Sequence, residues 1–239
     1  MKIEFDDGFA FGKGLFETIK VVDKRPIMLY KHLKRINKGL KELNIDNYIK
    51  ETDVLNYINN ETEVNYALKI IATDKNTLII KRKDNYIGLN RNEGIELKIS
   101  NIIRNSTSHM VYYKSLNYYD NIIEKKKATE EGYKEVIFLN EKGDISEGAV
   151  SNIFFIKDKK IFTPSLNSGI LAGTMREYII DHYDVQEKNI DYRSLENYDS
   201  AFITNSLFGV QWIRKIDKIQ FEKTELIYDI IKNIEKMGY

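Results

Sequence analysis

Lys114 is the residue whose type and surroundings point most directly to chemistry. It follows an apolar and aromatic stretch that begins at His109, and it precedes a segment with helical spacing of apolar side chains. Partial burial penalises the ammonium form of lysine, so such an amine can lose its proton near neutral pH and attack a carbonyl carbon. The chain has 37 lysines and arginines, and most lysines are solvated surface charges, so a surface role stays open at this point.

A second segment strengthens the chemical interpretation of Lys114. It is Gly143-Asp-Ile-Ser-Glu-Gly-Ala-Val-Ser-Asn-Ile-Phe-Phe155, and it carries the acidic residue Glu147. One predicted helix and one predicted strand separate it from the lysine. A lysine that forms a Schiff base with a carbonyl suggests pyridoxal phosphate chemistry. An ordinary glutamate in a hairpin turn is the alternative for Glu147.

The spacing of apolar residues predicts the elements that must position these side chains. Residues 29–43 have a helical stripe at positions 29, 33, 36, 40 and 43. Alternation and turn residues predict strands at 65–72, 77–83, 95–103, 152–156, 201–204 and 210–216, and a hairpin turn at 140–143 with antiparallel pairing. Further helices are predicted near 115–131, from a capping box at 174–177 to about 183, and at 222–237.

The predicted elements group into two domains. Residues 1–103 form a small N-terminal α/β domain, and residues 109–239 form a larger C-terminal domain. The polar stretch 104–108 lies between them as a linker, with a surface loop as the alternative.

Composition excludes several classes of protein. The formal net charge is +1 and there is no basic stripe, so a nucleic acid is not the expected partner. The absence of cysteine removes disulfides and thiolate chemistry, and the three histidines form no ligand pair, so we expect no metal. No apolar run approaches the roughly 20 residues of a membrane span. The expectation is a cytoplasmic protein that does not enter a membrane.

Five motifs together resemble the class IV aminotransferase superfamily, which includes aminotransferases and lyases that use pyridoxal phosphate. The motifs are Phe11-Gly-Lys-Gly-Leu-Phe-Glu-Thr18, His32-Leu-Lys-Arg-Ile36, Tyr113-Lys-Ser-Leu-Asn-Tyr118, Ser146-Glu-Gly-Ala-Val-Ser-Asn152 and Gly169-Ile-Leu-Ala-Gly-Thr-Met-Arg176. The resemblance implies an α+β fold with two α/β domains of the D-amino acid aminotransferase-like type. It also implies pyridoxal phosphate in the cleft between the domains, with residues 109–239 as the main cofactor-binding domain, and a homodimer.

The resemblance also assigns roles to individual residues. Lys114 would carry the cofactor covalently and move protons, and Glu147 would face the pyridine nitrogen. Further cofactor-binding positions that match the family are Arg35, Ser151, Asn152, Thr174, Met175, Asn205 and Ser206, with the phosphate held by Arg35, by Thr174 and Met175 at a helix start, and by the loop at Asn205 and Ser206. Taken alone, Arg35 could be a solvated helix charge and Thr174 a helix cap.

The resemblance leaves the reaction open between two enzymes and one inactive form. The sequences at 173–176 and 204–210 favour a lyase that converts 4-amino-4-deoxychorismate into 4-aminobenzoate and pyruvate, a step of folate biosynthesis. A branched-chain or D-amino acid type aminotransferase is the alternative, and a catalytically degenerate cofactor-binding homologue is a further one. A small-molecule amine is the expected substrate in both enzymes.

Two departures from the family pattern concern substrate binding and the start of the chain. Asp7 stands where the family usually has arginine, and the strand that usually precedes this segment is not predicted. Residues 81–86 lack the glycine-rich arginine loop common in the family. Arg82 and Tyr112 remain weak candidates for substrate binding, with a charged turn as the alternative for Arg82.

Overall fold

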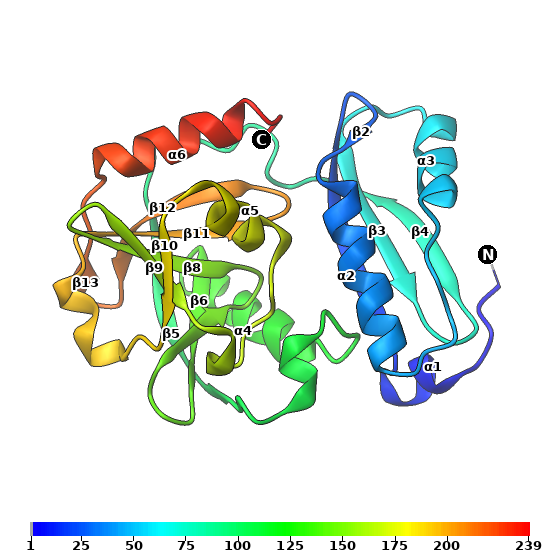
Figure 1. Cartoon of the computed structure of the whole chain (residues 1–239), viewed down its shortest axis with the longest axis horizontal. Helices are drawn as coiled ribbons and strands as arrows, with labels where there is room; N and C mark the ends of the chain where they lie inside the picture. Colours follow the sequence, from blue (N-terminus) through cyan, green and yellow to red (C-terminus); the bar gives the residue numbers. More distant parts are fainter. Residues whose placement is uncertain (1) are drawn as a thin grey trace. The chain divides into compact units, whose positions relative to one another are not determined.

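The computed structural model describes residues 2–239, which form two compact units (Figure 1). The first unit contains the chain up to Ile87, with Tyr113–Tyr118 and Gly238, and the second contains Gly88–Tyr112, Tyr119–Met237 and Tyr239. Each unit combines helices with a β-sheet, which confirms the predicted α+β class. Within residues 2–239, every helix is too short or too polar to span a membrane.

The division of the chain differs from the predicted domain boundary at 104–108. Strand β5 (Ile95–Arg104) pairs in parallel with β6 (Glu135–Asn140) and β12 (Gly209–Ile216), so it lies in the second unit and not in the first. The polar residues 104–108 follow β5 inside that same unit. Polar composition marks an exposed loop, but strand partners decide which unit a segment joins, and these are distant in sequence.

The first unit is a four-stranded antiparallel sheet with two helices packed on one face. The order is β2-β1-β3-β4, and its elements are β1 (Leu15–Val22), β2 (Arg25–Pro26), α2 (Leu29–Glu42), α3 (Glu51–Asn60), β3 (Tyr66–Ala72) and β4 (Thr77–Arg82). Alternate residues of β1 and β3, such as Ile19 and Leu68, join the apolar side chains of the two helices in one core. The predicted helix at 29–43 and the strands at 65–72 and 77–83 are confirmed.

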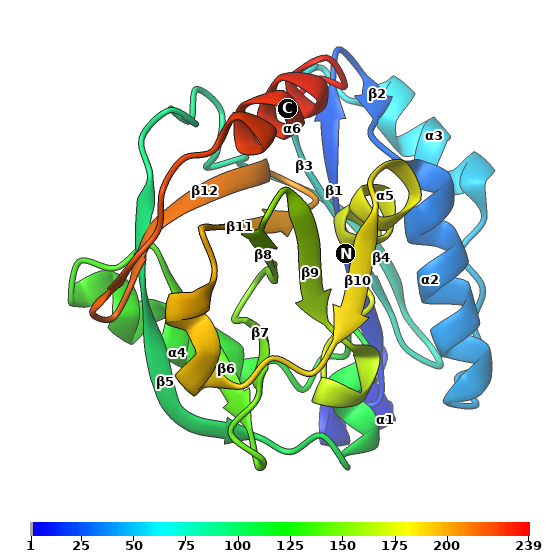
Figure 2. The same cartoon turned by 60° about the vertical axis from the view of Figure 1, so that its left-hand side comes forward.

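The second unit is built on a nine-stranded mixed sheet that curls around itself (Figure 2). The order is β10-β9-β8-β11-β12-β5-β6-β7, with β13 on β12. Its other elements are η1 (His109–Tyr112), α4 (Tyr119–Glu130), β7 (Ile145–Gly148), β8 (Asn152–Lys157), β9 (Lys160–Pro164), η2 (Leu166–Ser168), α5 (Thr174–His182), β10 (Val185–Lys188), η3 (Tyr192–Asn197), β11 (Ser200–Asn205), β13 (Ile219–Gln220) and α6 (Glu225–Glu235). The predicted hairpin at 140–143 is confirmed, as is antiparallel pairing of β8.

Two helix starts differ from the sequence-based predictions. The helix predicted near 115–131 begins only at Tyr119, because Ser115 pairs with Leu15 of β1 and its backbone is extended. In α5 the N-cap is Gly173 and not Thr174, so the capping box at 174–177 does not form. Thr174 is the first helical residue, and the N-cap glycine has no side chain that could cap the helix.

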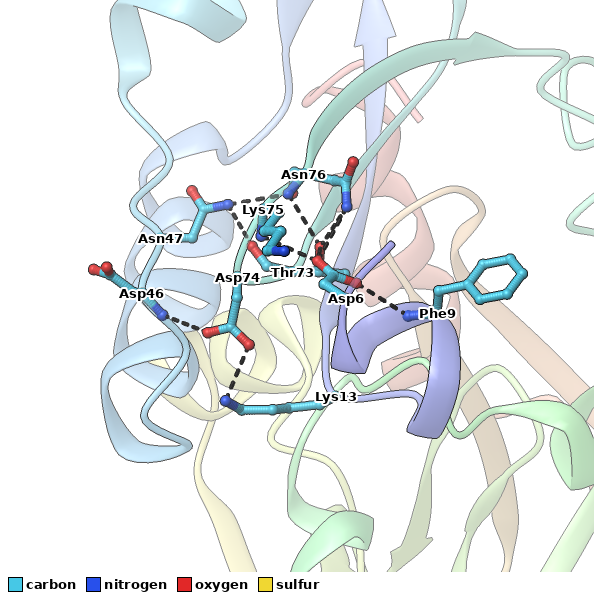
Figure 3. A network of polar contacts seen from close by, with 9 residues as sticks. All are labelled: Asp6, Phe9, Lys13, Asp46, Asn47, Thr73, Asp74, Lys75 and Asn76. Carbon is cyan, nitrogen blue, oxygen red and sulfur yellow. Dashed lines mark hydrogen bonds and ion pairs between the residues drawn. The ribbon is translucent and has the colours of Figure 1, made fainter. Parts of the chain in front are cut away.

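The N-terminal segment is fastened to the turn between β3 and β4 by the carboxylate of Asp6 (Figure 3). Asp6 N-caps the short helix α1 (Asp7–Phe11) through the Phe9 amide, and its other oxygen accepts hydrogen bonds from the Thr73 hydroxyl, the Lys75 amide and the Asn76 side chain. The hydrogen bond from Thr73, against a smaller opposing effect of burial, and the other donors lower the pKa of Asp6 to about 2. The segment that leads into β1 is therefore held by an ionised carboxylate.

We predict that this carboxylate contributes stability that is lost in acid. A carboxyl group whose pKa is lowered by folding stabilises the fold above its unfolded pKa of about 3.9, and the contribution disappears as the pH falls toward 2. Asp6→Asn should therefore lower the urea midpoint at pH 6, and its difference from the unsubstituted protein should shrink between pH 4 and about 2. Asp7→Asn, at an exposed neighbouring position, is the control. A constant difference over this range would contradict the prediction.

Candidate active site

Lys114 is attached to the first unit through the backbone, although it lies far from that unit in sequence. The Phe16 amide donates to the Lys114 carbonyl at 2.8 Å, and the Leu116 amide donates to the Gly14 carbonyl at 2.9 Å. A Cβ at Gly14 would lie 2.7 Å from the Leu116 side chain and 2.9 Å from the Ala72 carbonyl. A side chain at position 14 would collide with the Ala72 carbonyl of β3 and press on Leu116, so glycine here leaves room for the segment that carries the lysine.

The Lys114 amine lies against two aromatic rings. Its Nζ is 4.6 Å from the centre of the Phe16 ring and 5.2 Å from that of Tyr118, and the two rings meet edge to face. The side chain is half-buried, as the sequence pattern predicted. The rings restrict the rotamers of the lysine and exclude water from its sides, which holds the amine in one place.

Arg35 is held by a fully buried carboxylate. Its Nε and Nη2 donate to the two oxygens of Glu17 at 2.7 and 2.6 Å, and His32 Nδ1 lies 2.7 Å from the same carboxylate. Glu17 and His32 are buried in the core, whereas about a fifth of the Arg35 side chain is exposed (19%). The paired contact fixes the plane of the guanidinium.

The protonation states of this cluster follow from burial and charge. Burial would raise the pKa of Glu17, but the Arg35 charge and the hydrogen bonds lower it to about 2, so the carboxylate is ionised. Burial lowers the pKa of His32, with a smaller contribution from the positive charges of Arg35 and Lys114. The lowered pKa favours the neutral imidazole of His32. Because an ionised carboxylate only accepts hydrogen bonds, Nδ1 of His32 is the donor to Glu17.

In the second unit, Glu147 is a buried carboxylate with fixed partners. It lies on β7, and its Oε2 accepts a 2.9 Å hydrogen bond from the Leu171 amide and a 3.2 Å bond from Asn152 Nδ2. The Arg104 guanidinium is 3.6 Å from its other oxygen. These contacts distinguish Glu147 from a solvated turn glutamate, which was the alternative in the sequence.

Asn152 connects Glu147 to the start of α5. Its amide also donates to the Leu171 carbonyl at 2.9 Å, and a Cβ at Gly173 would lie only 2.0 Å from its side-chain oxygen. Glycine at 173 therefore lets the loop pass close to Asn152. The buried residues Thr174 and Met175 begin α5 just beyond, where backbone amides and the helix dipole favour an anion.

The other predicted cofactor residues of the second unit lie on turns shaped by side-chain contacts. Ser151 is buried, and its hydroxyl donates to Glu135 at 3.2 Å. Asn205 accepts from the amides of Leu207 and Phe208 and donates to the Val150 carbonyl. The Asn205 side chain therefore builds the turn that carries Ser206, which is half-buried.

The two weak substrate candidates differ in their surroundings. Tyr112 ends η1, and its hydroxyl donates to the Ser106 carbonyl at 2.6 Å within the second unit. Arg82 is exposed at the end of β4 in the first unit and lines an open groove of about 710 Å³. Among residues 2–239, no group of three or more His, Cys, Asp or Glu side chains is arranged to hold a metal ion.

Three residues of these clusters, Glu17, His32 and Arg104, had no role predicted from the sequence. A signal for Glu17 existed, since it occupies an inward position between Leu15 and Ile19 of a strand, where an acidic side chain needs a buried partner. The basic residues that could pair with Glu17 are His32 and Arg35 of the following helix, and both of them contact it in the structure. Arg104 gave no such signal, because it stands at the start of a polar stretch.

The first unit carries a half-buried lysine and an arginine held by a carboxylate, and the second unit carries a buried glutamate and the helix start at Thr174. Groups of these kinds suit the binding of a phosphorylated aromatic cofactor. A model of the amino-transferase class IV family matches residues 14–216, so the chain belongs to this family. This confirms the predicted superfamily and fold type.

Several known proteins are similar to the chain over most of its length. A Bacillus subtilis protein named aminodeoxychorismate lyase is 28% identical over 91% of this chain and 82% of its own. A solved structure from Legionella pneumophila, described as a putative 4-amino-4-deoxychorismate lyase, has a TM-score of 0.89 with 26% identity and covers 99% of this chain and 96% of its own. A probable branched-chain-amino-acid aminotransferase of Thermotoga maritima is 27% identical over 88% of this chain and 80% of its own.

We predict that Glu17→Gln destabilises the protein by about 3 kcal/mol, because it leaves the Arg35 charge without its buried counter-charge. The measurement is urea unfolding at pH 7. Glu51→Gln, at an exposed position at the start of α3, should cost less than about 1 kcal/mol. Equal effects of the two substitutions would show that the buried cluster is not a stabilising element.

Proposed function

We propose that the chain is a pyridoxal-phosphate-dependent lyase that converts 4-amino-4-deoxychorismate into 4-aminobenzoate and pyruvate. The observation that carries the proposal is the similarity to the Bacillus subtilis lyase over 91% of the chain, which includes both Lys114 and Glu147 motifs in order. The structural likeness to the Legionella pneumophila protein supports the same activity.

The residues of the chain fit this cofactor. A phosphate needs fixed donors and positive charge, and Arg35 and the start of α5 at Thr174 and Met175 supply both. The aromatic ring nitrogen needs an acidic partner, and Glu147 is a buried carboxylate whose position is fixed by three neighbours. Ser151, Asn152, Asn205 and Ser206 complete the proposed set. When bound, pyridoxal phosphate supplies an electron sink for a carbanion next to the substrate nitrogen.

Lys114 is the proposed catalytic base and acid. It would hold the cofactor covalently, and its amine, when free, would accept the proton that leaves the substrate ring carbon. The enolpyruvyl group departs, and the lysine returns a proton so that pyruvate forms. The ring that remains is aromatic, which makes the release of 4-aminobenzoate strongly favourable. Phe16 and Tyr118 keep the amine positioned for both proton transfers.

An aminotransferase of small amino acids is the second candidate, favoured by the similarity to the Thermotoga maritima protein. It would use the same lysine, glutamate and phosphate donors, so the substrate-side residues decide between the two reactions. The lyase releases 4-aminobenzoate without an amino acceptor, whereas the aminotransferase needs a 2-oxo acid. A degenerate homologue would bind the cofactor and do neither.

Homodimerisation and a cytoplasmic location are further parts of the proposal, taken from the same family resemblance. Sedimentation equilibrium of the cofactor-loaded protein measures the first directly. A monomer at micromolar concentration would contradict the proposed dimer.

We predict that Lys114→Ala abolishes both 4-aminobenzoate release and the visible absorbance of the covalently bound cofactor, with the fold retained. Purified protein is loaded with pyridoxal phosphate and supplied with enzymatically generated 4-amino-4-deoxychorismate. Circular dichroism checks the fold, and Lys134→Ala on the surface is the matched control. Retained absorbance in Lys114→Ala would refute the assignment of this lysine. The aminotransferase would be favoured if the loaded protein releases no 4-aminobenzoate but transfers the amino group of an amino acid to a 2-oxo acid.

We predict that Glu147→Gln lowers turnover far more than cofactor occupancy. Glutamine keeps a hydrogen-bonding side chain but removes the charge that favours the protonated ring nitrogen. Loss of one opposite charge shifts a neighbouring pKa by roughly 1–3 units, so turnover should fall at least about tenfold. Occupancy is measured by absorbance and turnover by product release. Unchanged turnover would exclude the proposed role.

A further inference from the structure

The loop that leads into α5 is held by two side chains of the second unit. The Leu171 amide donates to Glu147 at 2.9 Å, and Asn152 Nδ2 donates to the Leu171 carbonyl at 2.9 Å. The helix begins three residues later, after the N-cap Gly173, which has no side chain that could fix the first turn. Other contacts must therefore hold the first amides of the helix in place.

Arg176, in the first turn of α5, makes such contacts on the side of the sheet. It is buried, with 4% of its surface exposed. Its Nη2 donates to the Pro164 carbonyl at 3.0 Å and to Glu187 Oε2 at 2.5 Å. Pro164 ends β9 and Glu187 lies in β10, and these two strands pair in parallel. One nitrogen of the guanidinium therefore ties the first turn of α5 to two neighbouring strands.

These contacts suit a geometric role better than a direct attraction of anions. Arg176 and Glu187 carry opposite charges and form an ion pair, so the pair as a whole has no net charge and creates little potential at a distance. The position of the helix turn, in contrast, depends on the buried guanidinium. A phosphate oxygen accepts from backbone amides only within a narrow range of distances and angles, so a displaced turn would bind it less well.

We propose that Arg176 is a positioning residue for the phosphate of the cofactor, because it fixes the backbone amides of Thr174 and Met175. The inference rests on the proposed function, which places the phosphate at the start of α5. Arg176 acts through the backbone of the helix, with Pro164 and Glu187 as its supports. The last residue of the motif at 169–176 thereby gains a role that the sequence did not indicate.

The experiment separates binding of the phosphate from binding of the ring. 4-Deoxypyridoxine 5'-phosphate and 4-deoxypyridoxine share the pyridine ring and lack the aldehyde, so Lys114 attaches to neither, and only the first carries the phosphate. Calorimetry on the full chain, freed of cofactor, measures both dissociation constants. The dissociation constant of 4-deoxypyridoxine divided by that of its phosphate gives the phosphate preference.

Arg176→Gln should lower the phosphate preference about tenfold, which corresponds to one hydrogen bond to a charged group. The affinity for 4-deoxypyridoxine should stay unchanged, because the ring contacts lie elsewhere. A merely structural role would not produce this difference, since a general disturbance of the fold weakens both ligands. Equal weakening of the two ligands by Arg176→Gln would therefore overturn the proposal.

A second variant separates positioning from charge. Glu187→Ala removes a support of Arg176 and also one negative charge, at a side chain that is 41% exposed. If Arg176 acted as a charge alone, phosphate binding would become tighter, because an uncompensated arginine attracts an anion more strongly. Positioning predicts the opposite sign: the phosphate preference should fall about threefold, as expected for the loss of a partly exposed ion pair. Tighter phosphate binding by Glu187→Ala would overturn the proposal.

The matched control is Glu177→Ala, which makes the same charge change at an exposed position in the first turn of α5. Its phosphate preference should not fall. A decrease equal to that of Glu187→Ala would count against a specific role of the contact between Arg176 and Glu187.

The outcome for Arg176 is separable from the outcome for the proposed function. If the unsubstituted protein prefers the phosphorylated analogue and both variants keep this preference, the cofactor site stands and the positioning role fails. Release of 4-aminobenzoate is measured independently on cofactor-loaded protein. If no 4-aminobenzoate appears but the phosphate preference depends on Arg176 and Glu187, the positioning role stands and the lyase fails.

Discussion

The backbone hydrogen bonds between Gly14–Phe16 and Lys114–Leu116 are the contacts on which the candidate active site depends. They attach a segment from the middle of the chain to the first strand of the sheet in the first unit. Glycine at position 14 leaves room for this close approach. Because Phe16 also belongs to β1, the strand that anchors the lysine backbone places an aromatic ring beside its amine. The Lys114 amine, the proposed reactive group, is therefore positioned by contacts with a regular strand.

Strand β1 has different functions on its two faces. One face contributes Leu15, Ile19 and Val21 to the apolar core, and in the same row Glu17 fixes Arg35 and His32. The other face begins at Phe16, beside Lys114, and continues through Thr18 to Lys20. Alternation of side chains thus lets one strand hold Arg35 on the helical side and place Phe16 beside Lys114 on the other side. A shift of register by one residue would exchange the faces and remove both functions.

Buried charge in this protein is consistently accompanied by partners. Glu17 has Arg35 and His32, Lys20 has Asp84, and Glu147 has the Leu171 amide, Asn152 and Arg104. These partners hold each buried side chain in one orientation, whereas a solvated side chain would be free to move.

The sequence by itself determined the elements with strong local patterns and the chemistry of the motifs. Apolar spacing and turn residues predicted the helix at 29–43, the hairpin at 140–143 and the strands at 65–72 and 77–83. The order of the lysine and glutamate motifs indicated the family before any fold was known. Only the tertiary structure decided which unit β5 and residues 113–118 join, where α4 begins, and that Glu17 holds Arg35. These features depend on strand pairing and ion pairs between residues far apart in the chain, and no local pattern of side chains encodes such partners.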